Sequence, residues 1–144
     1  MGYSAPEGRQ GAEAGRGRSV SNEENVGAGT VVWRDLTVKN AAEVKEFYTR
    51  VTGWKADPVS MGDYDDYSML TEGGDCVAGV CHAQGGNAGM PAQWLIYIKV
   101  ADLDRSITEC TALGGKVIHG PRSMGDSRFC VIEDPAGAVA GLIE

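Results

Sequence analysis

The sequence predicts an α+β fold that contains two tandem βαβββ modules in one domain. Two observations lead to this fold class. In each half of the chain, a strand pattern is followed by an amphipathic helix and then by three further short strand patterns. The halves also repeat at one offset of 62 residues, which aligns Val38 with Val100, Gly53 with Gly115, and Val77-Ala78-Gly79 with Val139-Ala140-Gly141. A repeat of this length indicates duplicated supersecondary units that share a core.

The first half begins with a strand over residues 30–38, which are rich in β-branched side chains. Asn40 is predicted to cap the following helix, with Glu43 completing a capping box. Gly53 is expected to end that helix. The apolar residues at helical spacing are Val44, Phe47, Tyr48 and Val51, and the three later strands are predicted over residues 55–59, 67–70 and 76–82.

The second half repeats this order after a glycine-rich linker. Its opening strand covers residues 94–100, Asp102 is expected to cap the helix, and Gly114-Gly115 to end it. The predicted buried face of the helix carries Leu103, Ile107, Cys110 and Leu113. The last three strands are predicted over residues 116–119, 128–133 and 138–143, with a turn at Asp134-Pro135-Ala136-Gly137 between the final two.

The domain organisation follows from composition. Residues 1–29 contain seven glycines and few apolar side chains, and we expect a flexible tail there. Residues 30–144 are predicted to form the single domain. Within it, module one covers residues 30–82, the linker residues 83–93, and module two residues 94–144.

Charge and hydropathy exclude several classes of partner. The net charge of -7 argues against nucleic acid and anionic membranes. No apolar run approaches the roughly 20 residues that span a bilayer, and no signal peptide is recognisable, so a cytoplasmic location is expected. The chain has four cysteines without a CxxC pair, and we expect them to act as small hydrophobic residues.

Four short motifs occur in a characteristic order along the two modules. They are Phe47-Tyr48, Gly53-Trp54, Leu113-Gly114-Gly115 and Asp134-Pro135-Ala136-Gly137. In this order, on a 62-residue repeat, the chain resembles the vicinal oxygen chelate superfamily of glyoxalases, bleomycin-resistance proteins and extradiol dioxygenases. The resemblance covers residues 30–144. It implies a curved, cup-like mixed sheet and a homodimer.

The resemblance also implies where a metal would bind in the enzymes of this superfamily. The four corresponding positions here are Trp33, Gly79, Leu95 and Gly141. None of these side chains offers an oxygen, a thiolate or an imidazole to a divalent ion. We therefore expect no metal and no cofactor, and an enzymatic activity is left open but not favoured.

Candidate ligand-binding residues lie on the predicted strands. Asp35 follows Trp33 by two residues, so both side chains are expected on the same face of their strand. Asp35 could orient a ligand or act as a base, or it could simply bond to a neighbouring amide or arginine. The aromatic and soft residues expected to stack on a ligand, or else to fill the cup themselves, are Trp33, Tyr67, Met69, Tyr97 and Phe129.

The predicted function is therefore metal-independent binding of a small, partly apolar molecule, as in the bleomycin-resistance branch. The alternative is a glyoxalase-like lyase, isomerase or dioxygenase with a relocated metal site. A third hypothesis is a scaffold module that acts through its dimer surface. The sequence does not identify the ligand.

Overall fold

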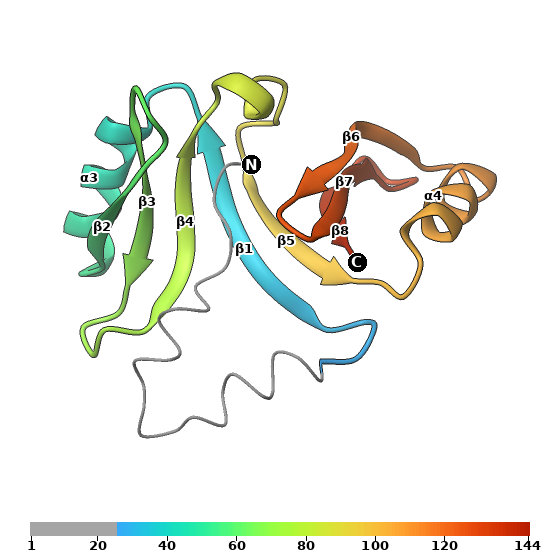
Figure 1. Ribbon diagram of the computed structural model, residues 1–144, viewed down its shortest axis with the longest axis horizontal. Helices are drawn as coiled ribbons and strands as arrows, with labels where there is room; N and C mark the ends of the chain where they lie inside the picture. The colour runs from blue at the N-terminus through green and yellow to red at the C-terminus, as the bar shows by residue number, and fades with distance from the viewer. Residues whose placement is uncertain (1–25) are drawn as a thin grey trace. The chain divides into compact units, whose positions relative to one another are not determined.

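The computed structural model describes residues 26–144, which form two compact units. The first unit contains Arg34–Trp94, and the second contains Gly27–Trp33 with Leu95–Glu144. The elements of the two units have the same order (Figure 1). The expected tail lies mostly outside the described residues. At its predicted end, the Gly29 amide donates a hydrogen bond to the carbonyl of Lys99, at 2.7 Å.

The first unit is a βαβββ module. Its elements are β1 (Val31–Val38), α3 (Ala41–Thr52), β2 (Lys55–Ser60), β3 (Asp65–Leu70) and β4 (Cys76–His82). The strand order is β2-β3-β4-β1, with β1 parallel to β4 and the other pairs antiparallel. A short 3₁₀ helix, η2 (Gly85–Asn87), lies in the segment predicted to be a plain linker, and buries Asn87.

The second unit has the same succession of elements. They are β5 (Trp94–Lys99), α4 (Leu103–Ala112), β6 (Lys116–Met124), β7 (Ser127–Glu133) and β8 (Val139–Ile143). The strand order is β5-β8-β7-β6, with β5 parallel to β8. Over residues 26–144 the fold is therefore the predicted α+β class, with a mixed set of eight strands and two α-helices.

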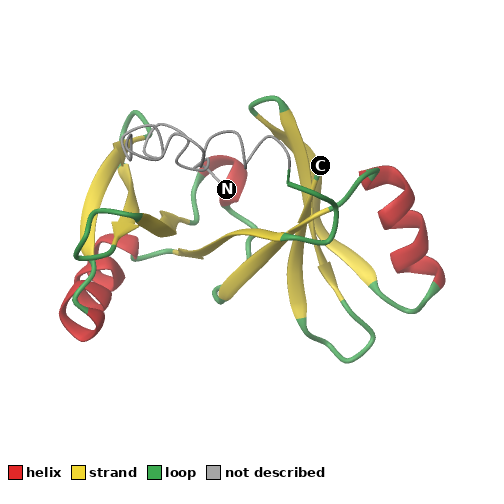
Figure 2. Cartoon of the chain, turned by 90° about the horizontal axis from the view of Figure 1, so that it is seen from below, coloured by secondary structure: helices red, strands yellow, loops and turns green. Residues whose placement is uncertain are grey.

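Each helix covers one face of its own strands (Figure 2). In the first unit, Ala41 packs against Met69, Ala78 and Val80. In the second unit, Leu103 packs against Cys130 and Leu142. These residues alternate along the strands with side chains that point to the opposite, helix-free face. The helix-free faces are the ones available for chemistry.

The apolar surfaces of the helices are only partly buried. On α3, Ala41, Val44 and Tyr48 contact the core, whereas Phe47 and Val51 are exposed. Phe47 and Val51 lie beside the row of α3 side chains that faces the core, so they are exposed to solvent. Leu113 is 72% exposed because it follows the last residue of α4 instead of lying on its buried face.

The helix ends match the sequence prediction with one exception. Gly53 ends α3 in the left-handed conformation, and the carboxylate of Asp102 accepts from the Arg105 amide. Asn40 was expected to cap α3 through its side-chain oxygen, but that prediction is wrong. Its amide group instead donates to the Glu43 carboxylate, at 2.9 Å, and the side chain makes no capping bond.

The repeated Ser-Met-Gly-Asp sequence occupies the same place in both units. Residues 60–63 join β2 to β3, and residues 123–126 join β6 to β7. Gly62 and Gly125 both have positive φ, of 101° and 63°. The repeated sequence is therefore a hairpin connection. Strand β6 extends up to this turn, five residues beyond its predicted end at His119.

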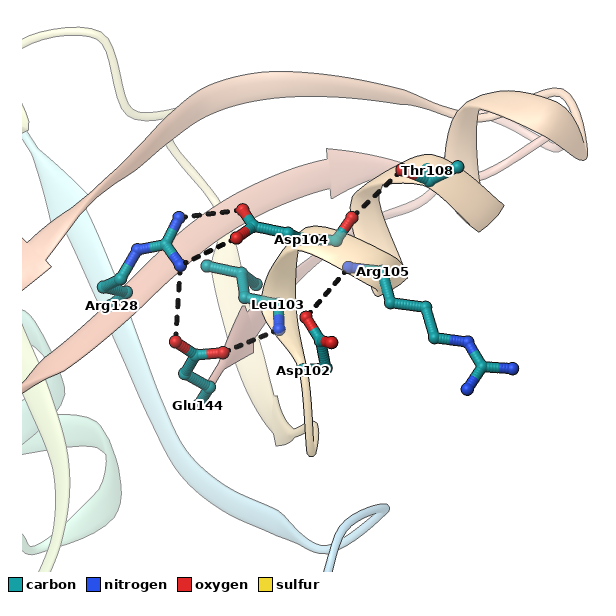
Figure 3. A network of polar contacts seen from close by, with 7 residues as sticks. All are labelled: Asp102, Leu103, Asp104, Arg105, Thr108, Arg128 and Glu144. Carbon is teal, nitrogen blue, oxygen red and sulfur yellow. Dashed lines mark hydrogen bonds and ion pairs between the residues drawn. The ribbon is translucent and has the colours of Figure 1, made fainter.

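A network of charged groups holds the start of α4 (Figure 3). The guanidinium of Arg128 donates to both carboxylate oxygens of Asp104, at 3.0 and 3.4 Å, and reaches Glu144 at 3.4 Å. Glu144 also accepts from the Leu103 amide, at 2.7 Å. The network joins the ends of β7 and β8 to the first turn of the helix.

This network predicts a small dependence of stability on acid pH. Hydrogen bonding by Arg128, with its charge, lowers the pKa of Asp104 below the ordinary 3.8. A depressed pKa favours the folded state above the ordinary value, and this contribution is lost as the pH falls through the folded-state pKa. We expect Arg128→Ala to lower the melting temperature slightly at pH 7 and to flatten its fall below about pH 4.

Thermal unfolding between pH 2 and pH 7 measures this effect. Arg105→Ala is the control, because the side chain of Arg105 points away from the network (Figure 3). Equal pH profiles for the two variants would show that the network contributes nothing.

Candidate functional sites on the helix-free faces

The helix-free face of the second unit is aromatic. Gly141 lies between Tyr97 on β5 and Val131 on β7, and Phe129 lies two residues before Val131 on the same face. The rings of Tyr97 and Phe129 are edge to face, with centroids 6.3 Å apart. Both side chains are buried. The structure thus brings together two of the predicted site residues from separate strands.

Tyr97 occupies the space above Gly141. A Cβ atom added to Gly141 would collide with Cδ2 and Cε2 of the Tyr97 ring, and would also lie 3.1 Å from its Cγ atom. The backbone approach is therefore possible only for glycine. Any side chain at this position would have to displace a ring that is 1% exposed.

An arginine and a neutral histidine border this aromatic face. The guanidinium of Arg122 lies over the Phe129 ring, 4.8 Å from its centroid, and its Nε donates to Nε2 of His119 at 3.1 Å. Burial, followed by the charge of Arg122, lowers the pKa of His119. The imidazole is therefore neutral at pH 7, as an acceptor at Nε2 requires. Both residues are partly exposed, so this edge can offer a ligand a cation and a ring.

The helix-free face of the first unit is polar. Gly79 on β4 lies between Asp35 on β1 and Ser68 on β3. Two residues further along β1, Thr37 pairs with Cys81 on β4. On β3, Asp66 precedes Ser68 by two residues and therefore lies on the same face. Asp35, Asp66, Ser68 and Thr37 are all at most 2% exposed.

Several oxygen atoms on this polar face have no hydrogen-bond partner among the described residues. One carboxylate oxygen of Asp66 accepts from the His82 amide, at 2.8 Å. The other oxygen of Asp66 and the hydroxyls of Ser68 and Thr37 have none. Burial, then the charges of Asp35 and Asp66 and a hydrogen bond to the Asp66 side chain, raise the pKa of Cys81 well above its usual value. Cys81 is therefore a protonated thiol and not a reactive nucleophile.

The remaining predicted site residues lie in different parts of the structure. Met69 is 0% exposed and packs in the core beneath α3, and Tyr67 lies against the same core. Both therefore point away from the polar face, because they alternate with Asp66 and Ser68 along β3. Trp33 is 7% exposed and belongs to the second unit, whereas Asp35 belongs to the first.

The residues present do not fit the metal site of the superfamily's enzymes. Trp33, Gly79, Leu95 and Gly141 supply no donor, and Tyr97 fills the place of a side chain at Gly141. Among residues 26–144, no three His, Cys, Asp or Glu side chains gather closely enough to hold a metal ion.

Asp66, Ser68, Thr37 and Arg122, which lie on or beside these faces, were not among the candidate residues predicted from the sequence. The available signal was the alternation along each strand. In β3 the large apolar residues Tyr67 and Met69 had to face α3, which turned Asp66 and Ser68 to the opposite side. The sequence prediction instead assigned the most apolar residues to the ligand.

A family model identifies the superfamily of this chain. Residues 29–140 match the model described as Glyoxalase/Bleomycin resistance protein/Dioxygenase superfamily. The chain belongs to this superfamily, as the four motifs predicted.

Relatives of known name are similar over most of this chain. It is 38% identical over 118 residues to "Putative glyoxylase CFP32" of Mycobacterium tuberculosis, covering 79% of this chain and 45% of that protein. It is 34% identical over 123 residues to "Anthracycline biosynthesis protein DnrV" of Streptomyces peucetius, covering 76% and 45%. The chain thus spans about half the length of the curated relatives it matches.

Solved structures support the fold. Methylmalonyl-CoA epimerase from M. tuberculosis has a TM-score of 0.52 at 16% identity, with 83% of this chain and 90% of that chain covered. A superfamily member from Vibrio splendidus 12B01 has a TM-score of 0.50 at 12% identity, with 77% and 95% covered. In residues 26–144, no helix is long and apolar enough to cross a membrane.

Proposed function

We propose that this protein binds a small, partly apolar organic molecule without using a divalent metal ion. The observation that carries the proposal is the Tyr97 ring packed on Gly141. It replaces a metal-binding side chain with an aromatic surface at one of the four positions that the superfamily's enzymes use. The other three positions also lack donors.

The proposed contacts differ between the two helix-free faces. In the second unit, the Arg122 guanidinium, which lies over the buried Phe129 ring, can stack on a flat ligand together with the partly exposed His119 ring. In the first unit, Asp35 and its polar neighbours can orient a ligand through hydrogen bonds. Met69 and Tyr67 are not part of the proposed site, because they pack in the core beneath α3.

The names of the relatives agree with such a ligand. Two of them, at 34% and 33% identity, are named for anthracycline biosynthesis. Anthracyclines are flat and aromatic, the shape that stacking surfaces favour. The alternative function, a glyoxalase-like lyase, isomerase or dioxygenase with a relocated metal, is in keeping with the glyoxylase name of another relative.

One experiment separates these functions. We expect less than about 0.1 equivalent of nickel, zinc, iron or manganese in the purified protein, and no change in melting temperature with a chelator. A resident metal would stabilise the folded state by mass action. The same metal-free protein, screened by thermal shift against a library of flat organic molecules, is expected to gain several degrees with its ligand.

About one equivalent of a divalent metal, with loss of stability on chelation, would overturn the metal-independent proposal and favour the enzyme. Metal-free protein that no organic compound stabilises would instead favour the scaffold hypothesis.

We also propose that the protein is a homodimer in the cytoplasm. Members of the superfamily to which the chain belongs often dimerise. All four cysteines are free, which fits a reducing compartment. Light scattering on the purified protein tests the dimer.

A further inference from the structure

We propose that the polar helix-free face of the first unit binds a protonated amino group of the ligand. The amine site is defined by Asp66, Ser68 and Thr37. This inference rests on the proposed function and names the chemical class of its ligand. It starts from a comparison of matched positions in the two modules.

Corresponding positions in the two modules carry opposite chemistry. In the second unit, Gly141 pairs with Tyr97 and Val131, and this row is apolar. In the first unit, Gly79 pairs with Asp35 and Ser68, and this row is polar. In the next row, Ile143 lies between Lys99 and Phe129 in the second unit, whereas Thr37 pairs with Cys81 in the first. The fold of a module therefore does not require polar side chains on this face.

The polar groups of the amine site are buried with hydrogen-bonding capacity to spare. Asp66 and Ser68 are 0% exposed and Thr37 is 2% exposed. One oxygen of Asp66 and both hydroxyl oxygens have no partner among the described residues. A buried polar group without a hydrogen bond destabilises the folded protein. A ligand that supplied hydrogen-bond donors would relieve this cost.

The chemistry of the oxygens selects a cation. An ionised carboxylate can only accept hydrogen bonds, and a buried carboxylate needs positive charge nearby. Within the described part of the chain, Asp66 lies 3.5 Å from Nδ1 of His82, and no lysine or arginine pairs with it. An ammonium group offers a positive charge and three N–H donors to these oxygens. A neutral alcohol offers one donor, and a carboxylate would be repelled.

A set of probes that differ in one group tests the inference on the full-length, metal-free protein. The probes are 1-naphthylmethylamine, 1-naphthalenemethanol and 1-naphthoic acid, titrated by calorimetry at pH 7. We expect the amine to bind at least about tenfold more tightly than the alcohol, because a hydrogen bond to a charged group is stronger than a neutral one. The acid should bind most weakly.

Two variants and one matched control locate the effect. Asp66→Asn keeps an oxygen for the His82 amide but removes the charge, and should reduce amine affinity about tenfold while leaving alcohol affinity unchanged. Asp65→Asn changes the exposed neighbouring carboxylate and should alter neither. Ser68→Ala should weaken amine binding to a smaller degree. It also provides a second test if Asp66→Asn does not fold.

The outcomes separate this inference from the proposed function. If the alcohol or the acid binds as tightly as the amine, the amine site is overturned while small-molecule binding stands. If none of the three probes binds, the amine site is also overturned, and the library screen decides the proposed function independently. Nα-acetyl-lysine amide distinguishes the source of the amine. Binding of this compound as tightly as the naphthyl amine would assign the site to a protein's lysine and overturn the small-molecule ligand.

Discussion

Replacing Gly141 with alanine is expected to lower the free energy of unfolding by about 3 kcal/mol. The added methyl group would collide with Tyr97 ring atoms close to the Cγ attachment point. Those atoms cannot swing aside as the end of a flexible chain would, and the ring also has an edge contact with Phe129. Equilibrium urea unfolding of the two proteins measures the difference.

The control for this substitution is Gly73→Ala. Gly73 has ordinary backbone angles, and a Cβ there would have only the Thr71 hydroxyl oxygen near it, at 3.8 Å. Its effect should stay within about 0.5 kcal/mol. Combining Gly141→Ala with Tyr97→Leu should cost less than the sum of the two single changes, since the smaller side chain leaves room for the methyl group. Strict additivity would show that the ring does not occupy this space.

Replacing Met69 with alanine is expected to lower the free energy of unfolding by about 2 to 5 kcal/mol. Met69 is completely buried between Ala41, Ala78 and Val80, so truncation leaves a cavity under α3. Because it faces away from the polar face, the variant should bind the ligand, or the naphthyl amine, with unchanged affinity at temperatures where it is folded. Chemical denaturation and calorimetry measure the two properties separately.

Met61→Ala is the matched control for Met69→Ala. Met61 follows the end of β2 at the hairpin connection and is partly exposed, so its truncation should cost less than about 1 kcal/mol. If Met69→Ala abolished binding with little loss of stability, Met69 would be a ligand contact after all, as its position in the sequence first suggested.

The two modules show how one fold unit can carry different chemistry. Gly79 and Gly141 hold equivalent places, yet one lies between Asp35 and Ser68 and the other between Tyr97 and Val131. The helices and the residues beneath them remain apolar in both units. Divergence at the helix-free faces therefore leaves the packing of each helix undisturbed.

Most elements of the fold could be predicted because their signals are local. The strand over residues 76–82 is found with the predicted bounds, and Gly53 ends its helix because glycine adopts the left-handed conformation without strain. Asp102 caps its helix as expected, through a bond to an amide three residues away. Asn40 does not cap its helix, because its side chain bonds to the nearby Glu43 carboxylate instead of to a backbone amide.

The candidate site was harder to predict because it depends on strand pairing. Tyr97 and Phe129 were predicted as site residues, but their contact depends on β5 and β7 both flanking β8. The contact between Arg122 and His119, which lie on the same strand, depends on the irregularity of the β6–β7 pairing between these two residues. Neither register can be deduced from one strand alone.

The sequence by itself determined the duplicated βαβββ order, the superfamily and the lack of metal donors at Trp33, Gly79, Leu95 and Gly141. All three depend on residue identities and on spacing along the chain. Only the tertiary structure decided which face of each strand meets a helix. That choice placed Tyr67 and Met69 in the core and Asp66, Ser68 and Thr37 on the opposite face of the first unit. The physical reason is that successive side chains of a strand point to opposite faces, and only the packing of a helix on one face decides which set is buried beneath it.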